Sequence, residues 1–153
     1  MSASLRVFTG TDAATESAAQ TAIALLSVDA ATVDPNSHQV APGTNSYEKW
    51  VAVVIDAADG KSYSNFWVEC GRGAPAGVTI KAGLSATGAT PTSATSVVAK
   101  TTLSPGRHFL WDANTYDTTG QRTAFLVLQE QVDPTAAPGA IPQIDLTFGW
   151  SQG

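Results

Sequence analysis

The sequence predicts an all-β domain, an immunoglobulin-like or jelly-roll-like β-sandwich of about seven to nine short strands and no long helix. Thirteen glycines and eight prolines divide the chain into many short apolar runs. No segment has the periodicity of a helix longer than two turns. Leu, Val, Ile and Phe supply only 32 of the 153 residues. This thin core suits two facing sheets, in which alternate residues point inward; a closed barrel is the less favoured alternative.

The N-terminal part contains two short β-like runs, at residues 5–8 (LRVF) and 21–28 (TAIALLSV). Between them, residues 12–20 are expected to form one helical turn or a polar loop. The length fits a single domain, residues 1–153, in which residues 1–20 are a possible N-terminal arm. Such an arm adds a strand to a partner's exposed sheet edge. Its candidate partner-binding residues are Leu5, Arg6, Val7 and Phe8. The favoured alternative is that LRVF is simply the first strand of its own sandwich.

The middle of the chain contains two runs rich in β-branched and aromatic residues, 47–56 (YEKWVAVVID) and 62–70 (SYSNFWVEC). The segment between them, 58–61 (ADGK), holds a glycine that tolerates the positive φ of a tight turn. We therefore expect the two runs to pair as a β-hairpin.

Residues 78–84 alternate in the manner of a half-buried strand, with Val78, Ile80, Ala82 and Leu84 on one face. The polar segment 85–96 that follows has no apolar anchor. It is expected to be a long loop that is mobile or packs on a neighbouring subunit.

The last part of the chain is predicted to contain weaker strands at 97–103 and 107–111, a clear strand at 123–132 and a closing strand at 143–151. The proline-rich segment 133–142 is expected to be a crossing loop.

Two of the predicted strands, 47–56 and 123–132, are apolar on both faces. One face fills the core, where we expect Trp50 and Leu126. The other face must be covered by a loop of the same chain or by another chain.

Charge and composition exclude several functions. Only 8 Lys and Arg residues are present, the net charge is −5 and the pI is near 4.7, so nucleic-acid binding is not expected. No apolar run approaches 18 residues, so no membrane span is expected. Residues 1–10 lack the pattern of a signal peptide. The single cysteine excludes an internal disulfide and suits synthesis in a reducing cytoplasm.

Motifs for catalysis or metal binding are weak. His38 and His108 have no partner at metal-ligand spacing. Residues 83–88 read GLSATG, which is not the GxSxG of a nucleophile elbow. Residues 112–117 (DANTYD) place oxygen ligands at alternate positions as calcium loops do, but the glycine and glutamate of such loops are missing, so a polar turn is favoured.

The scattered carboxylates and the cysteine have ordinary structural explanations. Turn chemistry accounts for the neighbouring pairs Asp12 with Glu16 and Asp56 with Asp59. Cys70 is interpreted as a buried, inert thiol. We predict no catalytic residue, no cofactor and no metal ligand.

Seven Trp and Tyr residues can either fill the core or form an exposed platform for sugar rings, and we favour the core. They are Trp50, Trp67, Trp111, Trp150, Tyr47, Tyr63 and Tyr116.

From residue 46 onward the order of strands and loops resembles a known class of proteins. The successive segments are YEKW and a strand, SYSNFWV, GVTIKAG, TPTSATSVVA, AFLVLQEQV, APGA and a terminal strand. This order is similar to that of the small β-sandwich virion proteins of tailed bacteriophages, of the capsid decoration (cement) type. The likeness covers about residues 46–150. Many such proteins end in an acidic tail, whereas this chain ends in GWSQG.

The resemblance implies a non-enzymatic structural protein, made in the host cytoplasm and placed on the capsid exterior, where it stabilises the shell. Its expected partners are the major capsid protein or neighbouring virion subunits, and a homo-oligomer is expected. The alternatives are a tail or baseplate component of the same fold, or a carbohydrate-binding β-sandwich module.

Overall fold

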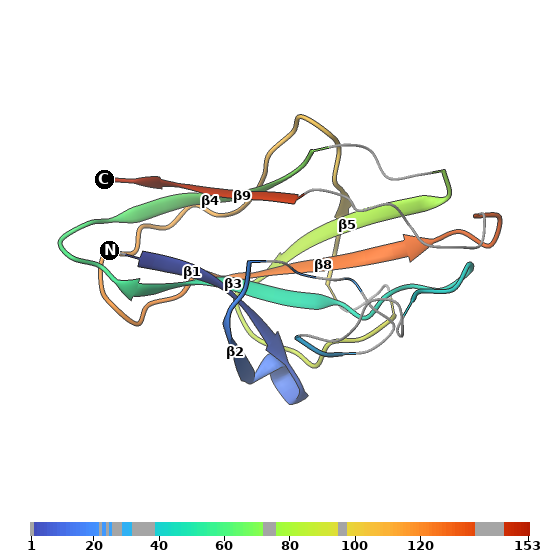
Figure 1. The fold of residues 1–153 in the computed structure, drawn as a ribbon, viewed down its shortest axis with the longest axis horizontal. Coiled ribbons are helices and arrows are strands. Elements are labelled where there is room, and N and C mark those ends of the chain that lie inside the picture. The colour runs from blue at the N-terminus through green and yellow to red at the C-terminus, as the bar shows by residue number, and fades with distance from the viewer. Residues whose placement is uncertain are drawn as a thin grey trace.

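A computed structural model describes residues 2–21, 23, 25, 29–31, 39–71, 76–94, 98–136 and 146–153. These residues form an all-β fold with nine strands in two antiparallel sheets and no α-helix, which confirms the predicted fold class (Figure 1). A single 3-10 turn, η1, spans Thr11–Ala13. The strands are β1 (Ser2–Thr9), β2 (Thr15–Ala19), β3 (Lys49–Ala57), β4 (Tyr63–Cys70), β5 (Val78–Ser85), β6 (Thr101–Thr102), β7 (Phe109–Asp112), β8 (Phe125–Val132) and β9 (Leu146–Gln152).

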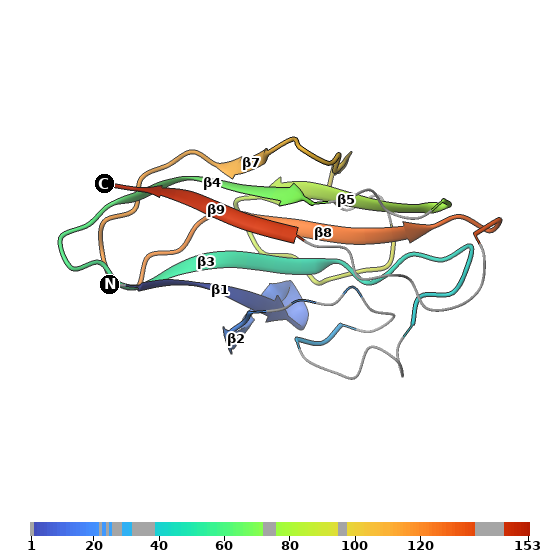
Figure 2. The same cartoon turned by 45° about the horizontal axis from the view of Figure 1, so that its top comes forward.

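The two sheets differ in size. The large sheet has the order β2-β1-β3-β8-β5-β6, and the small sheet has the order β7-β4-β9 (Figure 2). The inner core lies between them. Its buried members come from both sheets and from adjoining segments: Val7, Val51, Val53, Ile55, Ala58, Tyr63, Phe66, Val68, Cys70, Ile80, Ala82, Leu103, Trp111, Leu126 and Leu128.

The outer face of the large sheet is covered by segments of the same chain. Of the two covers expected for the strands that are apolar on both faces, a loop of the same chain is therefore the one observed. Trp50 and Phe125 point to this face, and their rings meet edge to face with centroids 5.3 Å apart. Ala13 of η1, together with Ala89 and Val98, packs on this second, smaller core. Trp50 is therefore a core residue, as predicted, but it lies in the outer core rather than between the sheets.

The segment 86–94 is a loop, as the sequence predicts, but it is anchored to the rest of the chain. Pro91 is buried and Ala89 packs on the outer core. Gly88 lies so close to η1 that a Cβ there would stand 2.1 Å from the carbonyl oxygen of Asp12. The buried amide of Gln129 donates to carbonyl oxygens of this segment, to Thr92 at 3.5 Å and Ala94 at 3.3 Å. The prediction that this segment has no anchor is wrong, because its small residues pack on the outer core and its carbonyl oxygens accept hydrogen bonds from Gln129.

The predicted hairpin of residues 47–56 and 62–70 is also wrong. A tight turn does form, since Lys61 N–H donates to Ala58 O at 2.9 Å and both Asp59 and Gly60 have positive φ. The two strands nevertheless enter different sheets, because both edges of β3 are taken by β1 and β8 and both edges of β4 by β7 and β9. The turn is a corner between the sheets.

The N-terminal residues belong to the sandwich. β1 pairs with β3 on one side and with β2 on the other, so the structure places it as a strand of its own large sheet. The segment 12–20 contains both the 3-10 turn and β2, a strand that the sequence did not predict. The predicted strand 21–28 lies mostly outside the described residues, and none of its described residues is in a strand.

The remaining strand predictions are confirmed with changed bounds. Ile80 and Ala82 point into the inner core as expected, but Leu84 on the same face is 52% exposed. In the described part of the predicted strand 97–103, residues 98–103, only the two residues of β6 are in a strand. Most of the predicted crossing loop 133–142 and the start of the closing strand lie outside the described residues.

A buried ion pair ties the outer cover to the large sheet. Lys100 Nζ lies 2.5 Å from Glu48 Oε2, and both side chains are buried. The indole N–H of Trp50 points to the other oxygen of Glu48 at 3.4 Å. The positive charge of Lys100 and the negative charge of Glu48 thereby compensate each other, because a buried charge without a partner is strongly destabilising.

Within the described residues, no helix is long and apolar enough to cross a membrane.

Candidate functional site

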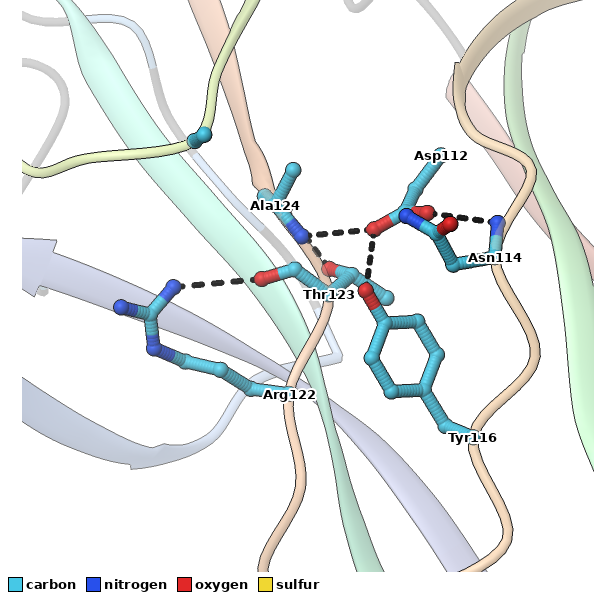
Figure 3. Close-up of a pocket in the computed structure, with 7 residues that line it drawn as sticks. Asp112, Asn114, Tyr116, Arg122, Thr123 and Ala124 are labelled. Carbon is cyan, nitrogen blue, oxygen red and sulfur yellow. Dashed lines mark hydrogen bonds between the residues drawn. The ribbon is translucent and has the colours of Figure 1, made fainter.

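An open hollow of about 340 Å³ lies where the end of β7 meets the segment leading into β8 (Figure 3). Its lining combines charged, polar and small side chains. The lining residues are Ala86, Asp112, Asn114, Tyr116, Arg122, Thr123 and Ala124.

Asp112 is the centre of the hydrogen bonding on one side of this hollow. Its Oδ1 accepts the backbone N–H of Asn114 at 2.8 Å. Its Oδ2 accepts the hydroxyl of Tyr116 and the backbone N–H of Ala124, each at 2.7 Å (Figure 3). The side chain thus forms an Asx turn with its own loop and fastens that loop to the strand beside it. This is the polar turn that the sequence favoured for residues 112–117.

Tyr116 is held in its neutral form. Burial, with the hydrogen bond to the Asp112 carboxylate and the charge of that carboxylate, raises the pKa of Tyr116 to about 12, while Asn114 and Arg122 oppose the shift. The hydroxyl therefore stays protonated at physiological pH and donates a hydrogen bond to the Asp112 carboxylate.

Arg122 lies on the other side of the hollow. Its guanidinium carbon is 4.2 Å from the ring centroid of Phe125 and 5.6 Å from that of Phe8. Its Nη1 donates to Thr123 O at 3.1 Å. Cation–π attraction and this hydrogen bond fix the position of the guanidinium.

The exposed face of the small sheet carries a second group of candidate residues. We call it the Trp67 face and define it by Trp67, Glu69, His108, Leu110 and Gly149. The rings of Trp67 and His108 stack with centroids 3.7 Å apart and an interplanar angle of 2°. His108 Nε2 lies 3.1 Å from Glu69 Oε2. In the strand register Trp67 stands between Leu110 and Gly149, and a Cβ at Gly149 would meet the indole at 2.2 Å.

The aromatic residues do not form one exposed row. Trp50, Trp111 and Tyr63 are buried, which agrees with the favoured core role. Trp150 and Tyr116 are half-buried and pack against the inner core. Trp67 is half-buried on the exposed sheet face.

The four predicted partner-binding residues all lie in β1. Leu5 and Val7 pack on the inner core, and Phe8 is buried in the outer core. Arg6 pairs with two carboxylates, Glu16 at 3.1 Å and Asp56 at 2.5 Å. Their contacts are thus within the chain, and their role in binding a partner stays a prediction.

The other sequence candidates are not brought together. His38 lies outside the described residues. Cys70 is buried in the inner core, as expected. The backbone at Gly83 is pressed against the segment 98–99, and Ser85 donates to Thr87 O at 2.7 Å. Among the described residues, no three His, Cys, Asp or Glu side chains gather in a way that could hold a metal ion.

Glu130 is a buried carboxyl group that the sequence did not single out. It is 8% exposed, and its Oε1 has no hydrogen-bond partner among the described residues. Burial raises the pKa of Glu130 to about 7. The sequence signal for it is an acidic residue between two glutamines at the end of an apolar strand.

Comparison with protein-family models, with curated proteins and with solved structures finds no match to this chain.

Proposed function

We propose that this chain is a non-enzymatic structural protein of a bacteriophage virion, a capsid decoration protein that binds the outer capsid surface and stabilises it. The order of strands and loops from residue 46 onward supports the proposal through its resemblance to such proteins. The two-sheet all-β fold agrees with that resemblance.

The observation that carries the proposal is the Trp67 face. Leu110 is 48% exposed there, and the indole of Trp67 beside it lies over the backbone of Gly149. A sheet surface with an exposed leucine and a partly exposed tryptophan has the chemistry of a protein interface, where aromatic side chains contribute much of the binding energy. The partner is the major capsid protein or a neighbouring virion subunit, and the same surface serves equally in a homo-oligomer or in a tail or baseplate position.

A matched pair of variants tests this role. Leu110→Lys places a charge on the Trp67 face, and Leu84→Lys places one at a similarly exposed leucine on the large sheet. Particles are assembled from the major capsid protein of the same genome, and bound protein is measured by co-sedimentation. We expect Leu110→Lys to weaken binding by about tenfold or more, and Leu84→Lys to bind as the parent does.

The melting temperatures of both variants are compared with that of the parent, because both leucines are exposed and neither change should unfold the domain. Equal binding by both variants would remove the Trp67 face from the interface. No binding of the parent to capsids or to purified tails would refute the virion role.

A carbohydrate-binding module is the second candidate, favoured by one observation. Trp67 lies on an exposed sheet face with the carboxylate of Glu69 and the imidazole of His108 nearby. The imidazole of His108 covers one face of this indole, so a sugar ring would contact the exposed imidazole and the edge of the indole, and the Glu69 carboxylate would accept from its hydroxyls. A glycan array probed with the parent and with Trp67→Ala distinguishes this function. A hit that the variant loses favours sugar binding, and an array without hits counts against it.

A further inference from the structure

Arg122 is a fixed cation without a carboxylate partner among the described residues. A guanidinium has five N–H groups. One hydrogen bond of the Arg122 side chain is found, to Thr123 O. Arg6, by contrast, has two carboxylates within 3.1 Å. The rings of Phe125 and Phe8 lie beneath the Arg122 guanidinium and leave the edge of the group open to donate.

The acidic side chain that lines the hollow, Asp112, already accepts hydrogen bonds from other groups. Both oxygens of Asp112 accept hydrogen bonds, from two backbone N–H groups and from Tyr116. In Figure 3 the Arg122 side chain extends away from this cluster, and its dashed line runs to Thr123. Arg122 is an exposed residue that lines the hollow, and its remaining N–H groups are therefore not engaged by Asp112.

From this arrangement we propose that the hollow beside Arg122 binds a carboxylate, the side chain of an aspartate or glutamate in an acidic peptide segment of another chain. A planar carboxylate matches the two parallel N–H groups of a guanidinium fork. The chain has a net charge of −5, and the hollow is lined by one cation, Arg122, and one carboxylate, Asp112, so a singly charged group fits better than a phosphate dianion. The inference stands apart from the proposed virion role, because the Trp67 face contributes no residue to this hollow.

The test is a titration of the isotopically labelled protein at pH 7 and constant ionic strength. Sodium acetate is the probe for a lone carboxylate, inorganic phosphate is the second arm and sodium chloride is the reference. The readouts are the NMR chemical shifts of the Arg122 Nε–H and of the backbone amides of Thr123 and Ala124. We expect saturable shifts with acetate that chloride does not produce.

Three variants make the result specific. Arg122→Gln should abolish the saturable shifts of Thr123 and Ala124. Arg122→Lys keeps a cation near the two rings but loses the planar fork, so it should bind acetate several-fold more weakly. Arg107→Gln, at an exposed arginine outside the hollow, should bind acetate as the parent does.

Two outcomes would overturn the proposal. Shifts that grow linearly with acetate and are equal in the parent and in Arg122→Gln indicate general ionic effects without a site. Tighter saturable binding of phosphate than of acetate indicates a phosphate site instead of a carboxylate site.

Discussion

Leu126 is the residue at which the strand assignment is tested most directly. Its side chain is fully buried in the inner core, in the strand that pairs with both β3 and β5. Leu126→Ala leaves a cavity in a close-packed interior and is expected to lower the free energy of unfolding by about 2–5 kcal/mol. Urea denaturation measures the loss. Leu84→Ala, at a leucine that is 52% exposed, is the control and should lower the free energy of unfolding far less. Equal losses in the two variants would contradict the assignment of Leu126 to the buried face of its strand.

Glu130 makes stability depend on pH. The pKa of its carboxyl is raised by burial from 4.5 to about 7 in the folded protein. The folded state therefore holds a proton that the unfolded state releases, so this contribution to stability is complete below about pH 4.5 and is lost as the pH rises through 7. One pKa unit corresponds to about 1.4 kcal/mol, which sets about 3 kcal/mol as the largest expected loss.

Urea denaturation of the parent and of Glu130→Gln between pH 4.5 and pH 8 checks this prediction. The difference between the two proteins isolates Glu130 from the other carboxylates. We expect the free energy of unfolding of the parent to fall with pH and that of the variant to fall less. Parallel curves would show that Glu130 ionises normally in the folded protein.

Single residues were only partly predictable from the sequence. The oxygen-rich segment 112–117 stood out, yet the partners of Asp112 include Ala124 N–H, which the fold alone brings to it. Arg6 and Asp56 meet because β1 lies beside β3, and no spacing in the sequence signals that pairing. Local patterns identify polar turns, whereas long-range ion pairs depend on sheet order.

At the scale of the element, β1 separates two hypotheses about the N-terminal residues. Deleting residues 1–10 removes the buried side chains of Val7 and Phe8 and one neighbour of β3. We expect a loss on the order of 3–6 kcal/mol, because each buried side chain contributes roughly 1.5–3 kcal/mol. Thermal melting followed by circular dichroism measures it. Phe8→Ala is the milder variant if the truncated protein does not fold. An unchanged melting temperature together with lost capsid binding would instead support the arm hypothesis.

The segment 86–94 is expected to stabilise the isolated domain. Replacing it by a short Gly-Ser turn removes Ala89 and Pro91 and uncovers the outer core around Trp50 and Phe125. The free energy of unfolding should fall by about 2 kcal/mol or more, as expected when large apolar side chains regain contact with water. A red shift of tryptophan emission should accompany the loss. A replacement as stable as the parent would mean that the outer core needs no cover.

The turn at 58–61 shows why element pairing was harder to predict than element position. Its residues have the positive φ values expected of a hairpin turn. The strands on either side still separate, because strands distant in sequence occupy their edges. Local turn chemistry determines the reversal of the chain but not the sheet in which each strand is placed.

At the scale of the whole molecule, the sequence predicted the fold class for a physical reason. Apolar runs this short, bounded by glycines and prolines, favour strands over helices. The thin supply of bulky residues is divided between two cores, one between the sheets and one under the cover of η1 and residues 86–94. The second core could not be located from the sequence, because apart from Val98 its cover is made of small residues such as Ala13 and Ala89, which carry little apolar signal.

The place of β8 in the large sheet has a consequence for synthesis. Lys49 of β3 pairs with Leu128 of β8, a strand that leaves the ribosome long after β3 does. Until then β2, β1 and β3 can only form a three-stranded ribbon, in which the β3 edge is unpaired and Val51 lacks its partner Leu126. Contacts so distant along the chain slow the search for the native state. The nascent chain is therefore most exposed to aggregation before β8 emerges, and a lower growth temperature or a chaperone that shields this ribbon should raise the yield of folded protein.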